Sequence, residues 1–77
     1  MVIDLAAIRN AVGVTQVQLA ERLGVGQGQI SRIEHQTDVL LSTLVDYLRA
    51  LGVEAELTVK VRRRRITQTL TDTGEGS

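Results

Sequence analysis

Residues 15–34 read TQVQLAERLGVGQGQISRIE, and this stretch decides the fold because it carries the signals for two short helices separated by a glycine. Thr15 is a favourable N-cap, and Gln18 three positions later completes the T-x-x-Q form of the capping box. Leu19 is followed by a second leucine four positions on, which is the spacing of a buried helix face. Gly24 comes where the chain must turn sharply, a position that favours positive φ. The pattern predicts a helix, a tight turn and a second helix.

The second helix is predicted to begin after Gly26, with Ile30 and Ile33 on its buried side. Its other side carries hydrogen-bonding side chains, namely Gln27, Gln29, Ser31 and Arg32. Two helices joined in this way form the arrangement in which the second helix enters the major groove of DNA. Arginine can pair bidentately with guanine, and glutamine with adenine. We expect this row to read bases, with Arg32 as the strongest candidate; the alternative is an ordinary solvated helix face.

The segment resembles the motif of the Cro/repressor-type (XRE) helix-turn-helix family at Gln16, Leu19, Ala20, Gly24, Val25, Ile30, Ile33 and Glu34. The resemblance covers residues 1–52 and implies a mainly α fold, with a four-helix lambda-repressor-like helix-turn-helix domain. By position it implies a DNA-binding set of Gln16, Gln27, Gly28, Gln29, Ser31 and Arg32, in which Gln16 contacts phosphate. It also implies a structural ion pair between Arg9 and Glu34, which would join the first helix to the end of the recognition helix.

Gly26 and Gly28 depart from the family's pattern, because these positions usually hold Ser, Thr or a longer polar side chain. One interpretation is that the missing side chains let the N–H groups at the helix N-terminus come close to a phosphate. The alternative is relaxed packing at a tolerant surface. Further phosphate contacts are predicted around the same helix, at Thr15, Gly26, His35 and Thr37, although a solvated loop role for His35 and a plain turn role for Thr37 remain open.

The composition limits the other functions. The chain has 77 residues, no Cys, Trp or Phe and one Tyr, so we expect a small aliphatic core with no disulfide and no thiolate metal site. The only histidine, His35, has no nucleophile or metal-ligand cluster beside it, so no enzyme activity, cofactor or metal is predicted. An apolar run of about 18 residues and a secretory h-region are both absent, which predicts no membrane partner and a cytoplasmic location.

Helical signals also flank the motif. Asp4 can cap a first helix that Gly13 ends, and this helix is expected to pack on the motif. A linker over residues 35–40 precedes a fourth helix that Gly52 ends. Its inward positions are predicted to be Leu41, Leu44, Val45, Leu48 and Leu51.

After the fourth helix the periodicity changes to strict alternation, which indicates a half-buried strand. Its apolar side comprises Val53, Ala55, Leu57, Val59 and Val61. Residues 62–65 contain no Gly, Pro, Asn or Asp to fold the strand back, so we expect it to pair antiparallel with its twin in a homodimer. The predicted organisation is a DNA-binding domain over residues 1–52, a dimerising strand with a basic end over 53–65, and a flexible tail over 66–77. For residues 66–71, which are Thr-rich and compatible with β structure, extension of the strand is the open alternative.

Charge is balanced overall, with nine basic and nine acidic residues, but it is unevenly distributed. Residues 1–52 hold four basic and five acidic side chains, whereas Lys60 and residues 62–65 place five cations within six positions. DNA affinity depends largely on neutralising phosphates, so a neutral helical unit is by itself a weak nonspecific binder. The basic run is expected to contact DNA or a partner; the alternative is a solvated strand end that discourages aggregation.

Helices of this type followed by one strand resemble the HipB and HigA-like antitoxins of bacterial toxin–antitoxin operons. The resemblance implies a dimer that binds a palindromic operator in double-stranded DNA, represses its own operon and binds a cognate toxin. Two alternatives remain open at this point. One is a stand-alone or phage-type repressor without a toxin, and the other is a protein-interaction adaptor that uses its strand for β-augmentation.

Overall fold

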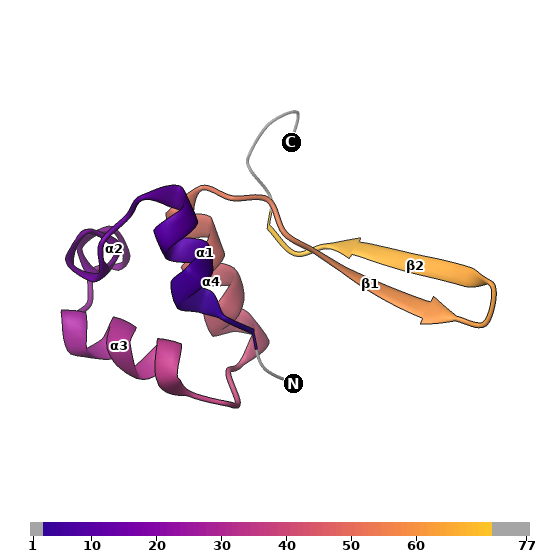
Figure 1. Ribbon diagram of the computed structural model, residues 1–77, viewed down its shortest axis with the longest axis horizontal. Helices are drawn as coiled ribbons and strands as arrows, with labels where there is room; N and C mark the ends of the chain where they lie inside the picture. Colours follow the sequence, from indigo (N-terminus) through magenta and orange to yellow (C-terminus); the bar gives the residue numbers. More distant parts are fainter. Residues whose placement is uncertain (1–2, 72–77) are drawn as a thin grey trace.

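Four helices and a two-stranded antiparallel hairpin follow one another in the computed structural model, which describes residues 3–71 (Figure 1). The elements are α1 (Leu5–Val12), α2 (Gln16–Leu23), α3 (Gln27–His35), α4 (Leu41–Leu51), β1 (Glu56–Val61) and β2 (Arg64–Thr69). The helices gather at one end of the molecule, and the hairpin extends away from the side on which α4 lies (Figure 1). The fold is mainly helical, as the sequence predicts.

The predicted helix boundaries have the expected local causes. The Asp4 carboxylate accepts a hydrogen bond from the Ala7 amide at 3.0 Å and caps α1. At α2 the capping box is complete, because the Gln18 amide donates to Thr15 Oγ1 at 3.0 Å and the Thr15 amide donates to Gln18 Oε1 at 2.9 Å. Gly24 has φ of 71°, in the left-handed region that a turn after α2 requires.

An aliphatic core lies between the helices. Its buried apolar residues are Leu5, Val14, Leu19, Ala20, Ile30, Ile33, Tyr47, Leu48 and Leu51. Tyr47, Leu19 and Ile30 are completely buried. Leu41 differs from the prediction, because its side chain is 57% exposed rather than turned inward at the start of α4. Ile30 and Ile33 are the buried residues of α3, so this helix packs next to α2 and faces the core through one side only.

The strand after α4 is paired within its own chain, so the prediction of a strand without an intrachain partner was wrong. β1 pairs antiparallel with β2, and Val59 lies opposite Ile66 in the register. Arg62 takes φ of 57° in the turn, a conformation that costs a non-glycine residue about 1–2 kcal/mol. The six-residue ladder, with Val59 against Ile66 and Thr58 against Thr67, offsets that cost.

The second strand of the hairpin also extends beyond the predicted boundary between the strand and the tail at residue 65. Residues 66–69 belong to β2 rather than to a flexible tail, and residues 72–77 of that predicted tail lie outside the described part. Val53 and Ala55 precede β1 and pack against the helical core. The buried Thr71 closes the base of the hairpin, because its hydroxyl accepts from the Ala55 amide at 2.9 Å and donates to the Val53 carbonyl at 3.1 Å.

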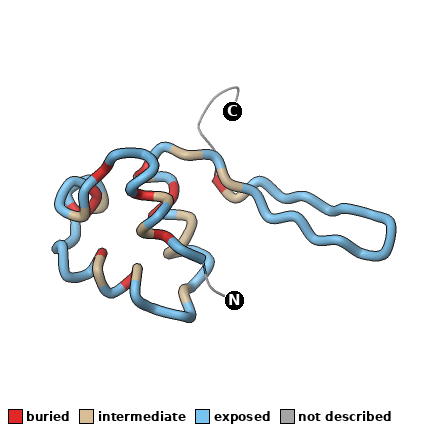
Figure 2. Tube along the Cα trace, viewed as in Figure 1, coloured by how far each residue is buried: buried red, intermediate tan, exposed pale blue. Residues whose placement is uncertain are grey.

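Beyond its base the hairpin is exposed along its whole length (Figure 2). Alternation along the paired strands puts Leu57, Val59, Val61 and Ile66 on one face, together with Gln68 and Arg64, which lie opposite Leu57 and Val61 in the register. The four apolar side chains are each 45–47% exposed. The opposite face carries Thr58 and Thr67, whose hydroxyl oxygens lie 3.2 Å apart, together with Lys60 and Arg65. The hairpin therefore has one mainly apolar face and one polar face.

Candidate nucleic-acid interface

The outward side of α3 is the main accessible polar surface of the predicted motif. α3 lies along one edge of the helical part, next to α2 (Figure 1). Its residues Ile30 and Ile33 are 0% and 7% exposed and anchor it to the core. The predicted base-reading residues Gln27, Gln29 and Arg32 are exposed, and Ser31 is half-buried. The fold thus leaves this side of α3 open to a ligand.

Helical geometry divides these residues between two flanks. At 3.6 residues per turn, Gly28, Arg32 and His35 follow one another at i, i+4 and i+7 and share a row. That row lies on the side of α3 away from the buried isoleucines. Gln29 instead precedes Ile33 by four positions and shares its flank. Arg32 is therefore better placed than Gln29 for contacts with base edges, and base contact remains a prediction for every residue of the set.

The start of α3 is formed without a polar side chain. Gly26 is the N-cap with an extended backbone and makes no side-chain capping bond. A Cβ atom added at Gly26 or at Gly28 would meet nothing within 4 Å. Packing within residues 3–71 therefore does not require either glycine, and the space outside this turn is free for a ligand.

A bidentate ion pair joins Arg9 of α1 to Glu34 in the last turn of α3. Arg9 donates from Nε to Glu34 Oε2 at 2.6 Å and from Nη2 to Glu34 Oε1 at 3.2 Å. The two side chains are only 10% and 3% exposed, respectively. Arg9 Nη1 also donates to the Val14 carbonyl at 2.9 Å, so the guanidinium joins α1, the loop before α2 and the end of α3. The residues that the family resemblance pairs are thus in direct contact.

Tyr47 from α4 completes this buried cluster, a role that was not predicted from the sequence. Its hydroxyl donates to Glu34 Oε2 at 2.5 Å and lies 3.2 Å from the Leu5 carbonyl. Burial raises the pKa of the Tyr47 hydroxyl, and the hydrogen bond to Glu34 raises it further. The signal was present in the sequence, because the single aromatic residue of an aliphatic core has a hydroxyl that needs a buried partner.

The ionisation of the cluster is set by its hydrogen bonds. Burial alone would raise the pKa of Glu34, but hydrogen bonds from Arg9, Tyr47 and Gln16 outweigh it and leave the pKa below its ordinary value. The hydrogen bond with Glu34 raises the pKa of Arg9. Glu34 is therefore a buried carboxylate, held charged by donors from three other segments.

Two glutamines connect this cluster to the surface. Gln16 Nε2 donates to Glu34 Oε1 at 2.9 Å, and Gln27 Nε2 donates to Gln16 Oε1 at 3.1 Å. Each amide nitrogen has a second N–H, so Gln16 can still donate to a phosphate while it is held by Glu34. Gln27 similarly keeps its carbonyl oxygen and one N–H for an adenine edge. The buried carboxylate thus orients the two side chains that the sequence assigns to phosphate and base contact.

The other predicted phosphate contacts are less closely grouped. Thr15, Gly26, His35 and Thr37 are all exposed. The Thr15 hydroxyl is already engaged in the α2 capping box, and the His35 ring donates from Nδ1 to the Ser31 carbonyl at 2.7 Å. The basic residues 62–65 lie at the far end of the hairpin, away from α3 (Figure 1). The structure does not bring this basic run to the α3 surface of the same chain.

Within residues 3–71, no group of three or more acidic or histidine side chains is arranged to hold a metal ion. The same residues include no helix with the length and apolar character needed to cross a bilayer.

Comparison with known proteins agrees with this architecture. A family model described as Helix-turn-helix matches residues 5–57. Antitoxin HigA1 from Mycobacterium tuberculosis strain CDC 1551 / Oshkosh is 40% identical over 58 residues, which are 74% of this chain and 39% of that protein. Antitoxin HigA1 from strain ATCC 25618 / H37Rv matches to the same extent. The chain thus spans 39% of the length of these curated relatives.

Proposed function

This chain belongs to the helix-turn-helix family, and we propose that it is a sequence-specific DNA-binding repressor that serves as the antitoxin of a bacterial toxin–antitoxin operon. As a dimer it binds a palindromic operator in its own promoter, and it also binds its toxin. The observation that carries the DNA-binding part is the hydrogen-bonded chain from Glu34 through Gln16 to Gln27, beside an exposed Arg32.

Readout by α3 follows from the chemistry of these side chains. Arg32 pairs with the acceptor edge of a guanine, and Gln27 pairs with an adenine, each contact contributing about 1–3 kcal/mol of discrimination. Gln16, at the start of α2, donates to a backbone phosphate and fixes the register. Because Gln16 and Gln27 are already oriented by Glu34, little side-chain freedom is lost on binding.

Dimerisation is part of the proposal because one α3 helix reads only a short half-site. Two α3 helices related by a twofold axis reach half-sites about 34 Å apart, one turn of DNA. The toxin part of the proposal is supported by the similarity to the two HigA1 antitoxins. A stand-alone repressor would share the same DNA footprint but would have no toxin encoded beside it.

The decisive experiment measures binding of the purified chain to its own promoter fragment, with a scrambled fragment of equal length and composition as the control. A preference for the promoter of at least about tenfold, with protection of two half-sites in a footprint, is the expected result. Equal binding to both fragments would contradict sequence-specific repression.

A protein-interaction adaptor is the second candidate, because the hairpin leaves four apolar side chains and two strand edges exposed. An adaptor would retain all partner binding after Arg32→Ala and Gln27→Ala. A repressor would lose its promoter preference with the same two substitutions.

A further inference from the structure

One face of the hairpin is apolar and uncovered in the part of the chain that the structure describes. The apolar residues of this hairpin face are Leu57, Val59, Val61 and Ile66, each 45–47% exposed, and the face also carries Gln68 and Arg64 near its two ends. A lone two-stranded hairpin is at best marginally stable in water and needs packing against another element. The base is fixed through Thr71, but the hairpin face itself has no helix over it (Figure 2). We therefore expect the hairpin face to pack against another element.

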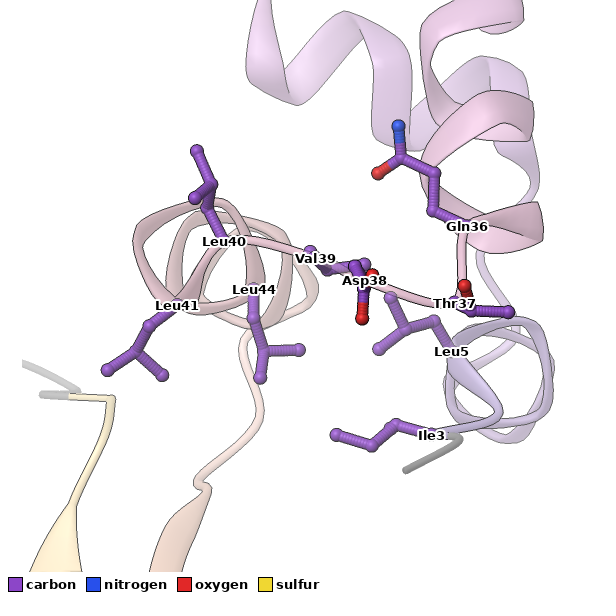
Figure 3. Close-up of a pocket in the computed structure, with 9 residues that line it drawn as sticks. All are labelled: Ile3, Leu5, Gln36, Thr37, Asp38, Val39, Leu40, Leu41 and Leu44. Atoms are coloured by element: carbon purple, nitrogen blue, oxygen red, sulfur yellow. The ribbon is translucent and has the colours of Figure 1, made fainter.

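A second apolar surface lies at the start of α4. A groove of about 370 Å³ is lined there by Ile3, Leu5, Leu40, Leu41 and Leu44, together with residues 36–39 (Figure 3). Leu40 and Leu41 are 74% and 57% exposed. Leu40 also occupies the N-cap of α4, where a capping side chain such as Ser or Asp is preferred, and no side-chain capping bond is made. The α4 groove thus has an apolar residue at a position that normally favours a polar one.

The two surfaces do not meet within one chain. The hairpin leaves the helical part on the α4 side and points away from it (Figure 1). We propose that they meet between two copies: the hairpin face of each protomer packs into the α4 groove of its partner, and the exchange is reciprocal about a twofold axis. This inference rests on the proposed function, because it specifies how the repressor dimer forms. It replaces pairing of single strands, since β1 already uses one edge for β2.

Charge favours a second copy as the occupant. Residues 53–71 hold five basic and two acidic side chains, a net charge of +3, whereas residues 1–52 hold four basic and five acidic ones, a net charge of −1. Asp38 lines the α4 groove, and Arg62 and Arg63 form the turn of the hairpin. The hairpin of one protomer therefore brings its arginines to the helical part of the partner, whose net charge is of opposite sign.

Size favours a reciprocal contact. A six-residue hairpin offers a face of about 20 Å by about 10 Å, which is small beside the roughly 800 Å² per partner of a stable interface. With exchange, each protomer contributes both its hairpin face and its α4 groove, so the contact is made twice. Neither contact surface includes a residue of α3, so the exchange leaves the outward side of that helix uncovered.

Cysteine cross-linking tests the exchange directly, because the natural sequence has no cysteine. Val59→Cys protein is mixed with Leu41→Cys protein and oxidised mildly, and a disulfide-linked heterodimer is expected. Thr58→Cys, on the opposite face of the hairpin, is the matched control and should give little heterodimer with Leu41→Cys. Cross-links only between two Val59→Cys chains would overturn the exchange in favour of strand-to-strand pairing. A dimer without the heterologous cross-link would overturn it as well.

Charged substitutions provide an independent readout. Val59→Glu and Leu41→Glu should each raise the dimer dissociation constant, measured by analytical ultracentrifugation, by at least about tenfold. Thr58→Glu should change it by less than about twofold, and circular dichroism checks that all three variants fold. A dimer unchanged by Val59→Glu would overturn the proposal and assign the hairpin face to a different partner.

The same variants separate this inference from the proposed function. Monomeric Val59→Glu protein should still prefer a single operator half-site over scrambled DNA, because α3 is untouched. If Val59→Cys and Leu41→Cys proteins form the exchanged cross-link but the wild-type protein shows no promoter preference, the exchange stands and the repressor function fails. If promoter preference is present while the cross-link is absent, the repressor function stands and the exchange fails.

Discussion

Gln16 Nε2 lies 2.9 Å from Glu34 Oε1, so the first residue of α2 is tied to the last turn of α3 through a carboxylate that is almost completely buried. This contact couples two parts of the proposed interface. Gln27 then bonds to the other end of the same amide. Substitutions at Glu34 are therefore expected to affect both the stability of the fold and DNA recognition.

Removing the Glu34 carboxylate should destabilise the fold strongly. Glu34→Ala leaves the Arg9 guanidinium buried without its anion and the Tyr47 hydroxyl without its acceptor, so we expect a loss of about 3–5 kcal/mol in the free energy of unfolding. Urea titration followed by circular dichroism measures it. Glu21→Ala, at an exposed position of α2, is the matched control and should cost under about 0.5 kcal/mol. A similar small loss at both positions would contradict a structural role for the pair.

The same carboxylate predicts the acid side of the stability profile. Because the pKa of Glu34 is lower in the folded state than its ordinary value of 4.5, its contribution is fully present above about pH 4.5 and is lost as pH falls through the folded pKa. Thermal unfolding measured from pH 7 to pH 3 should show this loss. In Glu34→Gln the decline over the same interval should be shallower. Parallel profiles for the two proteins would show that other carboxylates dominate.

Arg32 should affect sequence preference more than overall affinity. Arg32→Ala removes a bidentate guanine contact, so promoter binding is expected to weaken by about 1–3 kcal/mol while binding to scrambled DNA changes far less. Fluorescence anisotropy at fixed salt compares the two fragments. Arg49→Ala, at an exposed position in the last turn of α4, serves as the control. Equal losses on both fragments after Arg32→Ala would argue against base reading.

Gly28 separates the two interpretations of the glycine-rich start of α3. The added Cβ of Gly28→Ala meets nothing within 4 Å, and alanine is favoured over glycine in a helix by about 1 kcal/mol, so the variant should be more stable. If Gly28 permits close approach to DNA, promoter affinity should fall despite the gain in stability. Unchanged affinity would favour relaxed packing as the reason for this glycine.

A substitution in the turn of the hairpin is expected to increase its stability. Arg62 has φ of 57°, which glycine adopts without the steric cost of a Cβ, so Arg62→Gly should stabilise the hairpin by about 1 kcal/mol. Hydrogen exchange of the β1 and β2 amides measures the local effect. Arg63→Gly, the adjacent position without a positive φ, is the control and should not slow exchange.

The helical part was largely predictable because its determinants are local. Asp4 and Thr15 cap helices through residues three positions away, and Gly24 ends α2 through its own φ. The hairpin was not predictable from turn residues, because the positive φ at Arg62 is held by cross-strand pairs such as Val59 with Ile66. Residues 62–65 are all arginine and include none of the residues that usually form such a turn.

Within the candidate site, the residue types were predictable but their connections were not. The family pattern paired Arg9 with Glu34, yet the bonds from Gln16, Gln27 and Tyr47 depend on how α2, α3 and α4 pack. Leu41 shows the same limit, since its spacing fits an inward position but the helix turns it toward solvent. Periodicity places a residue on a helix, whereas packing decides which flank is covered.

The hydrogen-bonded chain from Glu34 to Gln27 also constrains how operator preference can evolve. Arg32 is exposed on the outward side of α3, so changes there retune recognition with little penalty in folding. A change at Gln27 instead disturbs an amide that leads back to the core carboxylate. Related regulators that diverge within one genome should therefore acquire new target sites first through the position of Arg32, and only later through that of Gln27.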